Sequence, residues 1–211
     1  MIPGKEEWMQ ALNMRHGTEL QKKISSVTVA VCGLGGLGSN IAVALARAGI
    51  GKLILTDFDK VDITNLHRQQ YKACQIGMNK TEALQANLEE INPYLKTDIH
   101  TLRLDEDNAK VILSDADIIC EAFDDAEEKA SIVNYVLSEM PEKYIVASSG
   151  MAGFSSANLI KTRRISKRFY LCGDEVSDVK GGIGLISTRV MLCAAHQAHA
   201  VLRIIAEEFE V

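Results

Sequence analysis

Residues 27–40 constrain the fold of this chain more than any other stretch. They begin with a run rich in β-branched residues and end in a turn with the spacing G-x-G-x-x-G and one additional glycine: Gly33, Gly35, Gly36 and Gly38. An apolar, alanine-rich segment, 41–48, comes next. This order predicts a strand, a tight turn and a helix whose N-terminus faces a phosphate or a ribose.

The segment after this helix supports the same interpretation. Residues 52–56 read as a second strand and lead into Asp57, which lies about twenty residues after the last glycine, where a ribose-binding acid is expected. A glycine-rich turn alone is also compatible with a purely structural connection. The strand, the helix and the acid at this spacing favour nucleotide binding.

Helical and strand-like segments alternate along most of the chain. The pattern predicts helices at 6–23, 80–91, 105–113 and 125–140, and strands at 97–102, 117–122 and 144–148. Asn79 is expected to cap the helix at 80–91. Such alternation is typical of a parallel sheet with right-handed crossovers.

The last part of the chain departs from this pattern. Two short strand-like segments, 158–165 and 168–172, predict an antiparallel hairpin, and a loop at 173–184 precedes a long apolar helix at 185–208. We therefore expect a single α/β domain over residues 1–211. Its fold class is Rossmann-like and doubly wound, with a mainly parallel sheet, an antiparallel C-terminal extension and a long C-terminal helix.

Charge and composition narrow the class of protein. The 211 residues carry a formal net charge of −5, which disfavours a general nucleic-acid binder or a protein of anionic membranes. No apolar run is long enough to span a bilayer, and residues 1–10 lack a signal-peptide pattern, so we expect a cytoplasmic protein. The five cysteines form no C-x-x-C pair, which predicts reduced thiols and neither disulfides nor zinc.

Polar residues gather where the predicted strands end. Since ligands of doubly wound sheets bind at the carboxyl ends of the strands, we expect one crevice to collect the residues that follow the glycine turn and the later strands. These are Asp57, Asn65, Arg68, Gln69, Lys80 and Asp124. Two cations and a second acid suit a triphosphate with Mg²⁺ better than a dinucleotide. Taken singly, Arg68 and Lys80 are also readable as solvated charges, and Asp124 as a helix cap.

At this point the sequence resembles a known family. The motifs are Gly-Leu-Gly-Gly-Leu-Gly-Ser at 33–39, Asp-Phe-Asp-x-Val-x-x-Thr-Asn-Leu-x-Arg-Gln at 57–69, Gly-x-x-Lys at 77–80 and Asn-Pro at 92–93. They resemble the adenylyltransferases that activate ubiquitin-like proteins, namely ThiF, MoeB and the adenylation domains of ubiquitin-activating enzymes. Residues 170–174 and 184–190 are most similar to short ThiF proteins of thiamine biosynthesis.

The resemblance implies a site and a reaction. The implied nucleotide-binding residues are Gly33, Gly35, Gly36, Gly38, Asp57, Asp59, Asn65, Arg68, Gln69 and Lys80, and the implied catalytic residues are Arg15, Arg68, Lys80 and Asp124. Within this set, Asp57 would hold the ribose, Asp124 would hold Mg²⁺, and Arg15 would reach into the partner's site of a homodimer. The implied reaction joins AMP from ATP to the C-terminal Gly carboxylate of a small ubiquitin-like, ThiS-like sulfur carrier and releases pyrophosphate.

Alternatives stay open at this stage. One is an NAD-dependent oxidoreductase, another a ThiF-like tRNA-modification dehydratase, and a third a binding scaffold without catalysis. The acidic balance and the absence of a basic surface segment weigh against the tRNA enzyme, and we expect neither nucleic acid nor membrane as a partner. Cys172 matches the region of a cysteine that forms a covalent link with the carrier, but a half-buried thiol on a strand is the preferred interpretation. His196 and His199 stand one helical turn apart, a spacing seen both in metal sites and in ordinary helix packing.

Overall fold

The structure is a computed structural model that describes residues 2–179 and 182–211. Seven strands form one sheet in the order β3-β2-β1-β4-β5-β7-β6. Their bounds are β1 Thr28–Cys32, β2 Lys52–Thr56, β3 Lys96–His100, β4 Ile118–Glu121, β5 Tyr144–Ser148, β6 Lys161–Arg164 and β7 Phe169–Gly173. All neighbouring pairs are parallel except β6 and β7, which confirms the mainly parallel sheet with an antiparallel extension.

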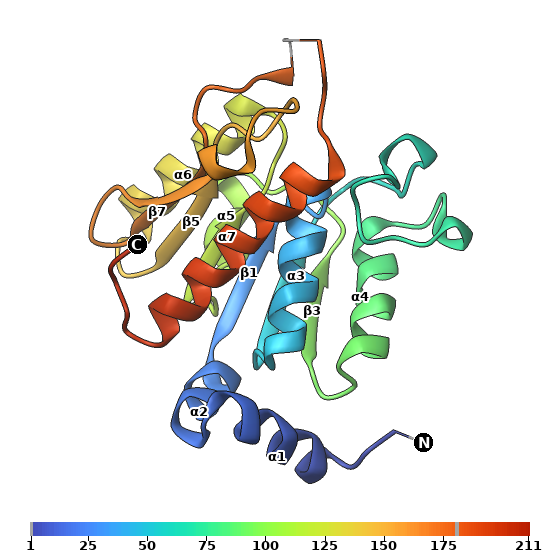
Figure 1. Ribbon diagram of the computed structural model, residues 1–211, viewed down its shortest axis with the longest axis vertical. Helices are drawn as coiled ribbons and strands as arrows, with labels where there is room; N and C mark the ends of the chain where they lie inside the picture. The colour runs from blue at the N-terminus through green and yellow to red at the C-terminus, as the bar shows by residue number, and fades with distance from the viewer. Residues whose placement is uncertain (1, 180–181) are drawn as a thin grey trace.

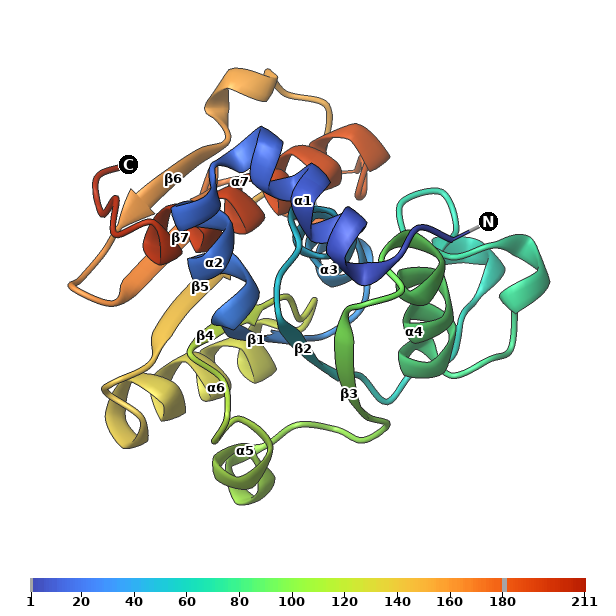
Figure 2. The ribbon, with the colours of Figure 1, turned by 90° about the horizontal axis from the view of Figure 1, so that it is seen from below.

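Helices cover both faces of this sheet (Figure 1). Three of them lie on one face: α3 (Gly36–Ala48), α4 (Lys80–Ile91) and α7 (Ser187–Ile205). Two others lie on the opposite face: α5 (Glu106–Ile112) and α6 (Ala126–Glu139). The view from below separates the three layers (Figure 2). Each face of the sheet buries its own apolar cluster, which is the arrangement expected of a doubly wound α/β fold.

The N-terminal segment differs from its prediction. The single helix expected at 6–23 is two helices, α1 (Lys5–His16) and α2 (Thr18–Ser26), because Gly17 adopts φ +83° between them. Both lie below the sheet, at the amino-terminal ends of its strands (Figure 1). Gln21 ties α2 to the main body, since its side-chain amide donates to the carbonyl of Gly49 at the end of α3.

Other element boundaries also differ from the predictions. Helix α3 begins at Gly36 rather than at residue 41, because the glycine turn itself forms the first helical turn. Asn79 stands before α4 but its side chain makes no capping hydrogen bond. Asp125, not Asp124, caps α6 by accepting from the backbone N–H groups of Glu127 and Glu128. Asp124 is therefore not used as a cap.

The predicted hairpin and C-terminal helix are present. β6 and β7 pair as an antiparallel hairpin, and β7 returns to pair in parallel with β5. The predicted loop at 173–184 begins one residue later, because Gly173 is the last residue of β7; residues 174–178 and 182–184 form neither helix nor strand, and residues 180–181 lie outside the description. Helix α7 packs along α3 and carries a buried face. Among the described residues, no helix combines the length and apolarity that a membrane span requires.

Candidate active site

A pocket of about 570 Å³ opens at the carboxyl ends of the central strands. It collects residues that follow β1, β2, β4, β5 and β7, from segments far apart in the sequence. Ten of the residues singled out in the sequence line it: Gly33, Gly35, Gly36, Asp57, Asp59, Asn65, Arg68, Gln69, Lys80 and Asp124. The structure thus brings these ten residues together at one edge of the sheet, whereas Gly38 and Arg15 do not line the pocket.

Two glycines of the turn, Gly33 and Gly38, pack too closely against backbone atoms for a side chain to fit. A Cβ on Gly33, which has φ +88°, would lie 2.9 Å from the carbonyl oxygen of Ala122, and one on Gly38 would lie 1.8 Å from the carbonyl oxygen of Gly33. Gly38 thus serves the packing of the turn. No side chain caps α3 at Gly35, so its first N–H groups remain available to an anion.

Asp57 is held rigidly at the end of β2. Its carboxylate accepts from the backbone N–H of Leu34 at 2.6 Å and from that of Asp59 at 2.8 Å. Burial raises the pKa of this carboxyl, while the ammonium of Lys80 and these two N–H groups act in the opposite direction. The acid is thereby fixed beside the glycine turn, in the position expected for a ribose ligand.

Lys80 lies at the start of α4 with its side chain only 5% exposed. Its Nζ donates to Asp59 at 2.7 Å and lies 3.8 Å from Asp57. A lysine ammonium carries three N–H donors, so this arrangement orients the cation and leaves donor capacity for a ligand. The two acids also compensate the cost of burying the charge.

Arg68 is the most informative cation of the pocket. Its Nη2 donates to the side-chain oxygen of Asn65 at 2.9 Å, but its Nε is buried without a hydrogen-bond partner in the described part of the chain. The side-chain oxygen of Gln69 is buried and unpartnered in the same sense. Burial lowers the pKa of Arg68, and the carboxylate of Asp124 opposes this shift, which places the two charges near each other. Since buried polar groups are normally satisfied, these atoms fit a site whose ligand completes them.

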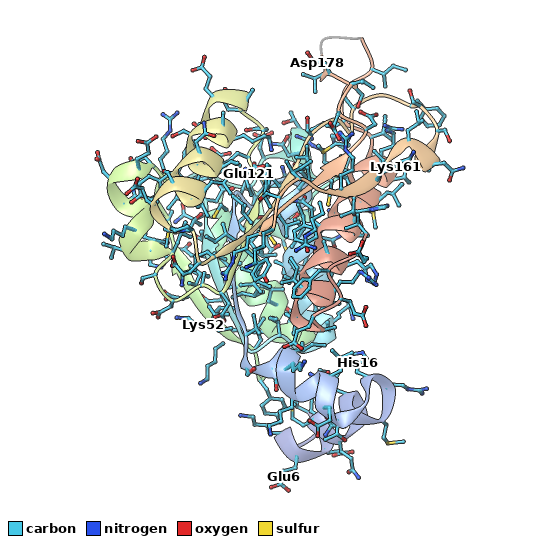
Figure 3. The ribbon with its side chains drawn as sticks, turned by 90° about the vertical axis from the view of Figure 1, so that its left-hand side faces the viewer. Glu6, His16, Lys52, Glu121, Lys161 and Asp178 are labelled. Atoms are coloured by element: carbon cyan, nitrogen blue, oxygen red, sulfur yellow. The ribbon has the colours of Figure 1, made fainter. Side chains whose placement is uncertain are left out.

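Sequence reasoning missed an ion pair at the floor of the pocket. Glu121, the last residue of β4, is 0% exposed, and Lys129 of α6 donates to both of its oxygens at 2.6 Å. Lys129 also lies 3.2 Å from the hydroxyl of Ser148, and both residues line the pocket. Figure 3 shows Glu121 in the interior of the molecule. The sequence did not reveal this pair, because an acid at the end of an apolar strand is normally expected to be exposed.

Three other lining segments carried no readable signal. They are residues 102–104 after β3, 149–152 after β5 and 175–179 after β7. The first contributes Arg103, which pairs with Glu128 across the pocket rim. Their side chains follow no catalytic pattern, and only the strand order brings them to the same opening.

Arg15 lies outside this pocket. It is an exposed residue in the last turn of α1, and α1 lies at the opposite end of the sheet from the pocket (Figure 1). In Figure 3, Glu6 and His16 of this helix lie at one end of the molecule and Asp178, on a pocket-lining segment, lies at the other. Within one chain, Arg15 therefore takes no part in the site.

Cys172 is buried, not half-buried. It is 0% exposed in β7, and burial raises the pKa of its thiol to about 11. His196 contacts the hydroxyl of Thr162 through Nδ1 at 2.9 Å. Among residues 2–179 and 182–211, no three histidines, cysteines or acids form a group suited to a metal ion. Asp124 is exposed at the pocket and is one of several carboxylates there; Mg²⁺ commonly uses one or two protein carboxylates together with phosphate oxygens.

Comparison with known sequences extends these observations. The model of the ThiF family matches residues 9–211. Adenylyltransferase and sulfurtransferase MOCS3 of Aedes aegypti is 40% identical over 109 residues, which are 51% of this chain and 25% of that protein. Ubiquitin-like modifier-activating enzyme 5 of Caenorhabditis elegans is 45% identical over 83 residues, which are 39% of this chain and 20% of that protein. The chain thus spans between 19% and 27% of the length of the curated relatives it matches most strongly.

Solved structures show the same fold. The E. coli tRNA N6-threonylcarbamoyladenosine dehydratase TcdA, in complex with ATP, superposes with a TM-score of 0.87 at 19% identity, covering 99% of this chain and 98% of TcdA. E. coli MccB with ATP gives a TM-score of 0.66 at 22% identity, covering 90% of this chain and 58% of MccB. At these identities the likeness concerns the fold, and it confirms the Rossmann-like architecture.

Proposed function

Because the chain belongs to the ThiF family, we propose that it is an ATP-dependent adenylyltransferase that activates the C-terminal carboxylate of a small ubiquitin-like protein. One observation carries the proposal: the glycine turn, Asp57 and two cations share one pocket, where Arg68 Nε and Gln69 Oε1 are buried without partners among the described atoms. Phosphate oxygens of a bound nucleotide would accept from Arg68 Nε, and a donor of the nucleotide, such as a ribose hydroxyl, would satisfy Gln69 Oε1. The MOCS3 relative is named an adenylyltransferase, and its match covers 51% of this chain.

Within the class of small ubiquitin-like proteins, the proposed substrate is a sulfur carrier of the ThiS type that ends in Gly-Gly. This part rests on the similarity of residues 170–174 and 184–190 to short ThiF proteins, and it assigns the protein to thiamine biosynthesis. A glycine carboxylate is already an anion at neutral pH, so the attack needs no strong general base. The pocket accordingly contains cations and acids rather than a Ser-His-Asp arrangement.

The reaction follows from these charges. A carboxylate oxygen of the carrier forms a bond to the α-phosphorus of ATP, and the bond from that phosphorus to the β-phosphate oxygen breaks. The products are the acyl adenylate and pyrophosphate. Arg68 and Lys80 would reduce the repulsion between two anions and stabilise the charge that develops on pyrophosphate. The free N–H groups at the start of α3 would bind phosphate oxygens.

Magnesium belongs to the same proposal. Asp124 would hold the ion together with phosphate oxygens, and the carboxylate lies close enough to Arg68 to affect its pKa. When bound, Mg²⁺ neutralises phosphate charge. The remaining work falls to the chain's own residues: Asp57 orients the ribose, and Arg68, ordered by Asn65, orients the phosphates.

Homodimerisation is the proposal that gives Arg15 a role. Since α1 lies far from its own pocket, Arg15 can assist the reaction only from a second copy of the chain. Mixing Arg15→Ala with Asp124→Ala protein should then restore activity, because one site in each mixed dimer is intact. Absence of recovery, once subunit exchange has been demonstrated, would remove Arg15 from catalysis.

A tRNA substrate is the second candidate. Contrary to the expectation that the protein lacks a basic surface segment, the exposed β6–β7 hairpin carries five basic residues: Lys161, Arg163, Arg164, Lys167 and Arg168. Figure 3 labels Lys161 on this edge strand. TcdA, the tRNA dehydratase with the same fold, covers nearly the whole chain. The basic hairpin is therefore the observation that favours a tRNA substrate as the second candidate.

One experiment separates the candidates. ATP–pyrophosphate exchange should appear with Mg·ATP only when a ThiS-like carrier ending in Gly-Gly is added. If adding the carrier does not stimulate exchange, and adding tRNA instead causes ATP to be consumed, a tRNA substrate replaces the carrier protein as the proposed substrate. Calorimetry showing that the protein binds NAD and does not bind ATP would instead favour an NAD-dependent oxidoreductase.

A further inference from the structure

The pocket has two halves that the sheet order separates. The glycine turn and Asp57 follow β1 and β2, whereas residues 149–152 and 175–179 follow β5 and β7, on the other side of β4. Under the proposed function, the nucleotide occupies the half over β1 and β2. The half over β5 and β7 is then the place where the second substrate approaches the α-phosphate.

The wall of this second half is built on a buried ion pair. Asp174 follows β7, and its side chain is 3% exposed; Arg189 lies in the first turn of α7, and its side chain is 5% exposed. Arg189 Nη2 donates to Asp174 Oδ2 at 2.5 Å. Neither residue lines the pocket, so the pair stands directly behind the wall.

Asp174 fixes the segment that does line the pocket. Its Oδ1 accepts from the backbone N–H groups of Val176 at 3.0 Å and Ser177 at 2.8 Å, and from the hydroxyl of Ser177 at 2.9 Å. Burial works to raise the pKa of Asp174, but these donors and Arg189 together lower it. The group is therefore a carboxylate at neutral pH, with each oxygen engaged.

Arg189 fixes the neighbouring segment. Its Nη1 donates to the carbonyl oxygens of Ser155 at 2.5 Å and Ser156 at 2.9 Å, and its Nε donates to that of Met151 at 3.4 Å. Met151 lines the pocket. Unlike Arg68, this arginine has no need of a ligand, because carbonyls and a carboxylate of the chain take up its donors.

Two glycines allow the two segments to interlock. A Cβ on Gly150, at φ +77°, would lie 2.2 Å from Asp174 Oδ1, and one on Gly173, at φ +141°, would lie 1.8 Å from the carbonyl oxygen of Ser149. The backbone N–H of Asp174 donates to the carbonyl of Gly150 at 2.9 Å, and that of Glu175 donates to the carbonyl of Ser149 at 2.9 Å. The segments after β5 and β7 are thus held as one unit.

We propose that Asp174 and Arg189 are positioning residues for the second substrate: they hold residues 149–152 and 175–177 as the wall along which the carrier's C-terminal tail reaches the nucleotide. The inference rests on the proposed function. It assigns the pair to the second substrate and not to ATP, because every contact of the pair leads to the β5 and β7 side of the pocket.

Hydrogen exchange of the protein alone tests the structural part. Asp174→Ala should abolish the protection of the Val176 and Ser177 amides, and Asp174→Asn, which keeps an acceptor oxygen, should abolish less of it. Asp98→Asn is the matched control, since it weakens an ion pair with Lys52 at the other edge of the sheet. Unchanged protection in Asp174→Ala would overturn the inference.

Steady-state exchange kinetics test the assignment to the second substrate. In Asp174→Asn and Arg189→Lys, kcat/KM for a ThiS-like carrier ending in Gly-Gly should fall by about 10²-fold, because small misplacements of a reactant cost that much. The loss should appear mainly in kcat, because a misplaced carrier carboxylate attacks the bound nucleotide more slowly, and the calorimetric Kd of Mg·ATP should stay unchanged. An equal loss of ATP affinity would overturn the assignment. Wild-type protein that binds Mg·ATP but shows no carrier-dependent exchange would refute the proposed function instead, so the two failures are distinguishable.

Discussion

Two arginines beside the pocket differ in whether the chain itself satisfies their hydrogen-bond donors. Arg68 lines the pocket and keeps a buried Nε without a partner among the described residues, whereas Arg189 lies behind the wall and donates to three carbonyls and a carboxylate. Arg68 is incomplete without a ligand, and Arg189 is complete within the chain. The half of the pocket with Arg68 therefore has a hydrogen-bond donor left for an anionic ligand. In the half over β5 and β7, the arginine instead fixes the backbone of the pocket wall.

The largest expected effect concerns stability. Arg189→Met should lower the free energy of unfolding by about 3–5 kcal/mol, because it leaves the Asp174 carboxylate buried without its partner. Urea denaturation at neutral pH measures this. Arg68→Met is the matched control and should lose only about 1 kcal/mol, the worth of an ordinary hydrogen bond to Asn65. Equal losses would erase the distinction between the two arginines.

The next effect concerns rate. Arg68→Ala and Lys80→Ala should each reduce carrier-dependent ATP–pyrophosphate exchange by about 10²–10³-fold, as expected for loss of a preorganised group that stabilises developing charge. Arg47→Ala, an exposed arginine in the last turn of α3, should leave the rate unchanged. Wild-type exchange in Arg68→Ala would show that the buried Nε binds no group of the nucleotide during the reaction.

A pH effect distinguishes the ribose acid. Because Asp57 has a raised pKa, its carboxylate should be present at neutral pH and lost on acidification earlier than that of an ordinary aspartate. Adenosine affinity should therefore fall as the pH drops through this raised value, since protonation removes an acceptor for the ribose hydroxyls. Calorimetry with adenosine avoids the titration of phosphate groups.

Two controls make this measurement specific. Asp57→Asn should bind adenosine weakly and without this pH dependence, and 2′,3′-dideoxyadenosine should show none with the wild-type protein. A pH dependence that persists in Asp57→Asn would show that another group titrates, and the ribose assignment would be withdrawn.

The smallest effect is expected at Cys172. Its thiol is buried with a pKa raised to about 11, so it is protonated at neutral pH and unreactive. Cys172→Ala should leave exchange near the wild-type rate, and iodoacetamide should label exposed Cys74 in the native protein while sparing Cys172. Loss of exchange in folded Cys172→Ala would place this thiol in the chemistry.

Local spacing predicted the nucleotide half of the pocket well. Short stretches of sequence determine where strands end and helices begin. The sequence therefore shows a recognisable local pattern at the glycine turn, at Asp57 and in the block that contains Arg68. The same reasoning gave the parallel sheet and the C-terminal hairpin. Gly17 was passed over as a helix break because the residues on both sides favour helix.

The second half was not predictable in this way. The Asp174–Arg189 pair joins residues fifteen positions apart across a loop, and the carbonyls that Arg189 binds lie 33 to 38 positions away. The Glu121–Lys129 pair was hidden for another reason: an acid at the end of an apolar strand reads as exposed, whereas the structure buries it completely beneath Lys129. Pairing across loops depends on strand order, which spacing alone does not determine.

The most direct test of the account is the intact mass of the carrier. After incubation of the protein with Mg·ATP and a ThiS-like carrier ending in Gly-Gly, mass spectrometry should find the carrier joined to AMP. A carrier with an amidated C-terminus should gain no mass, because the free carboxylate is the proposed nucleophile. AMP attached equally to the amidated carrier, or to neither form while ATP binds normally, would contradict the adenylyltransferase assignment.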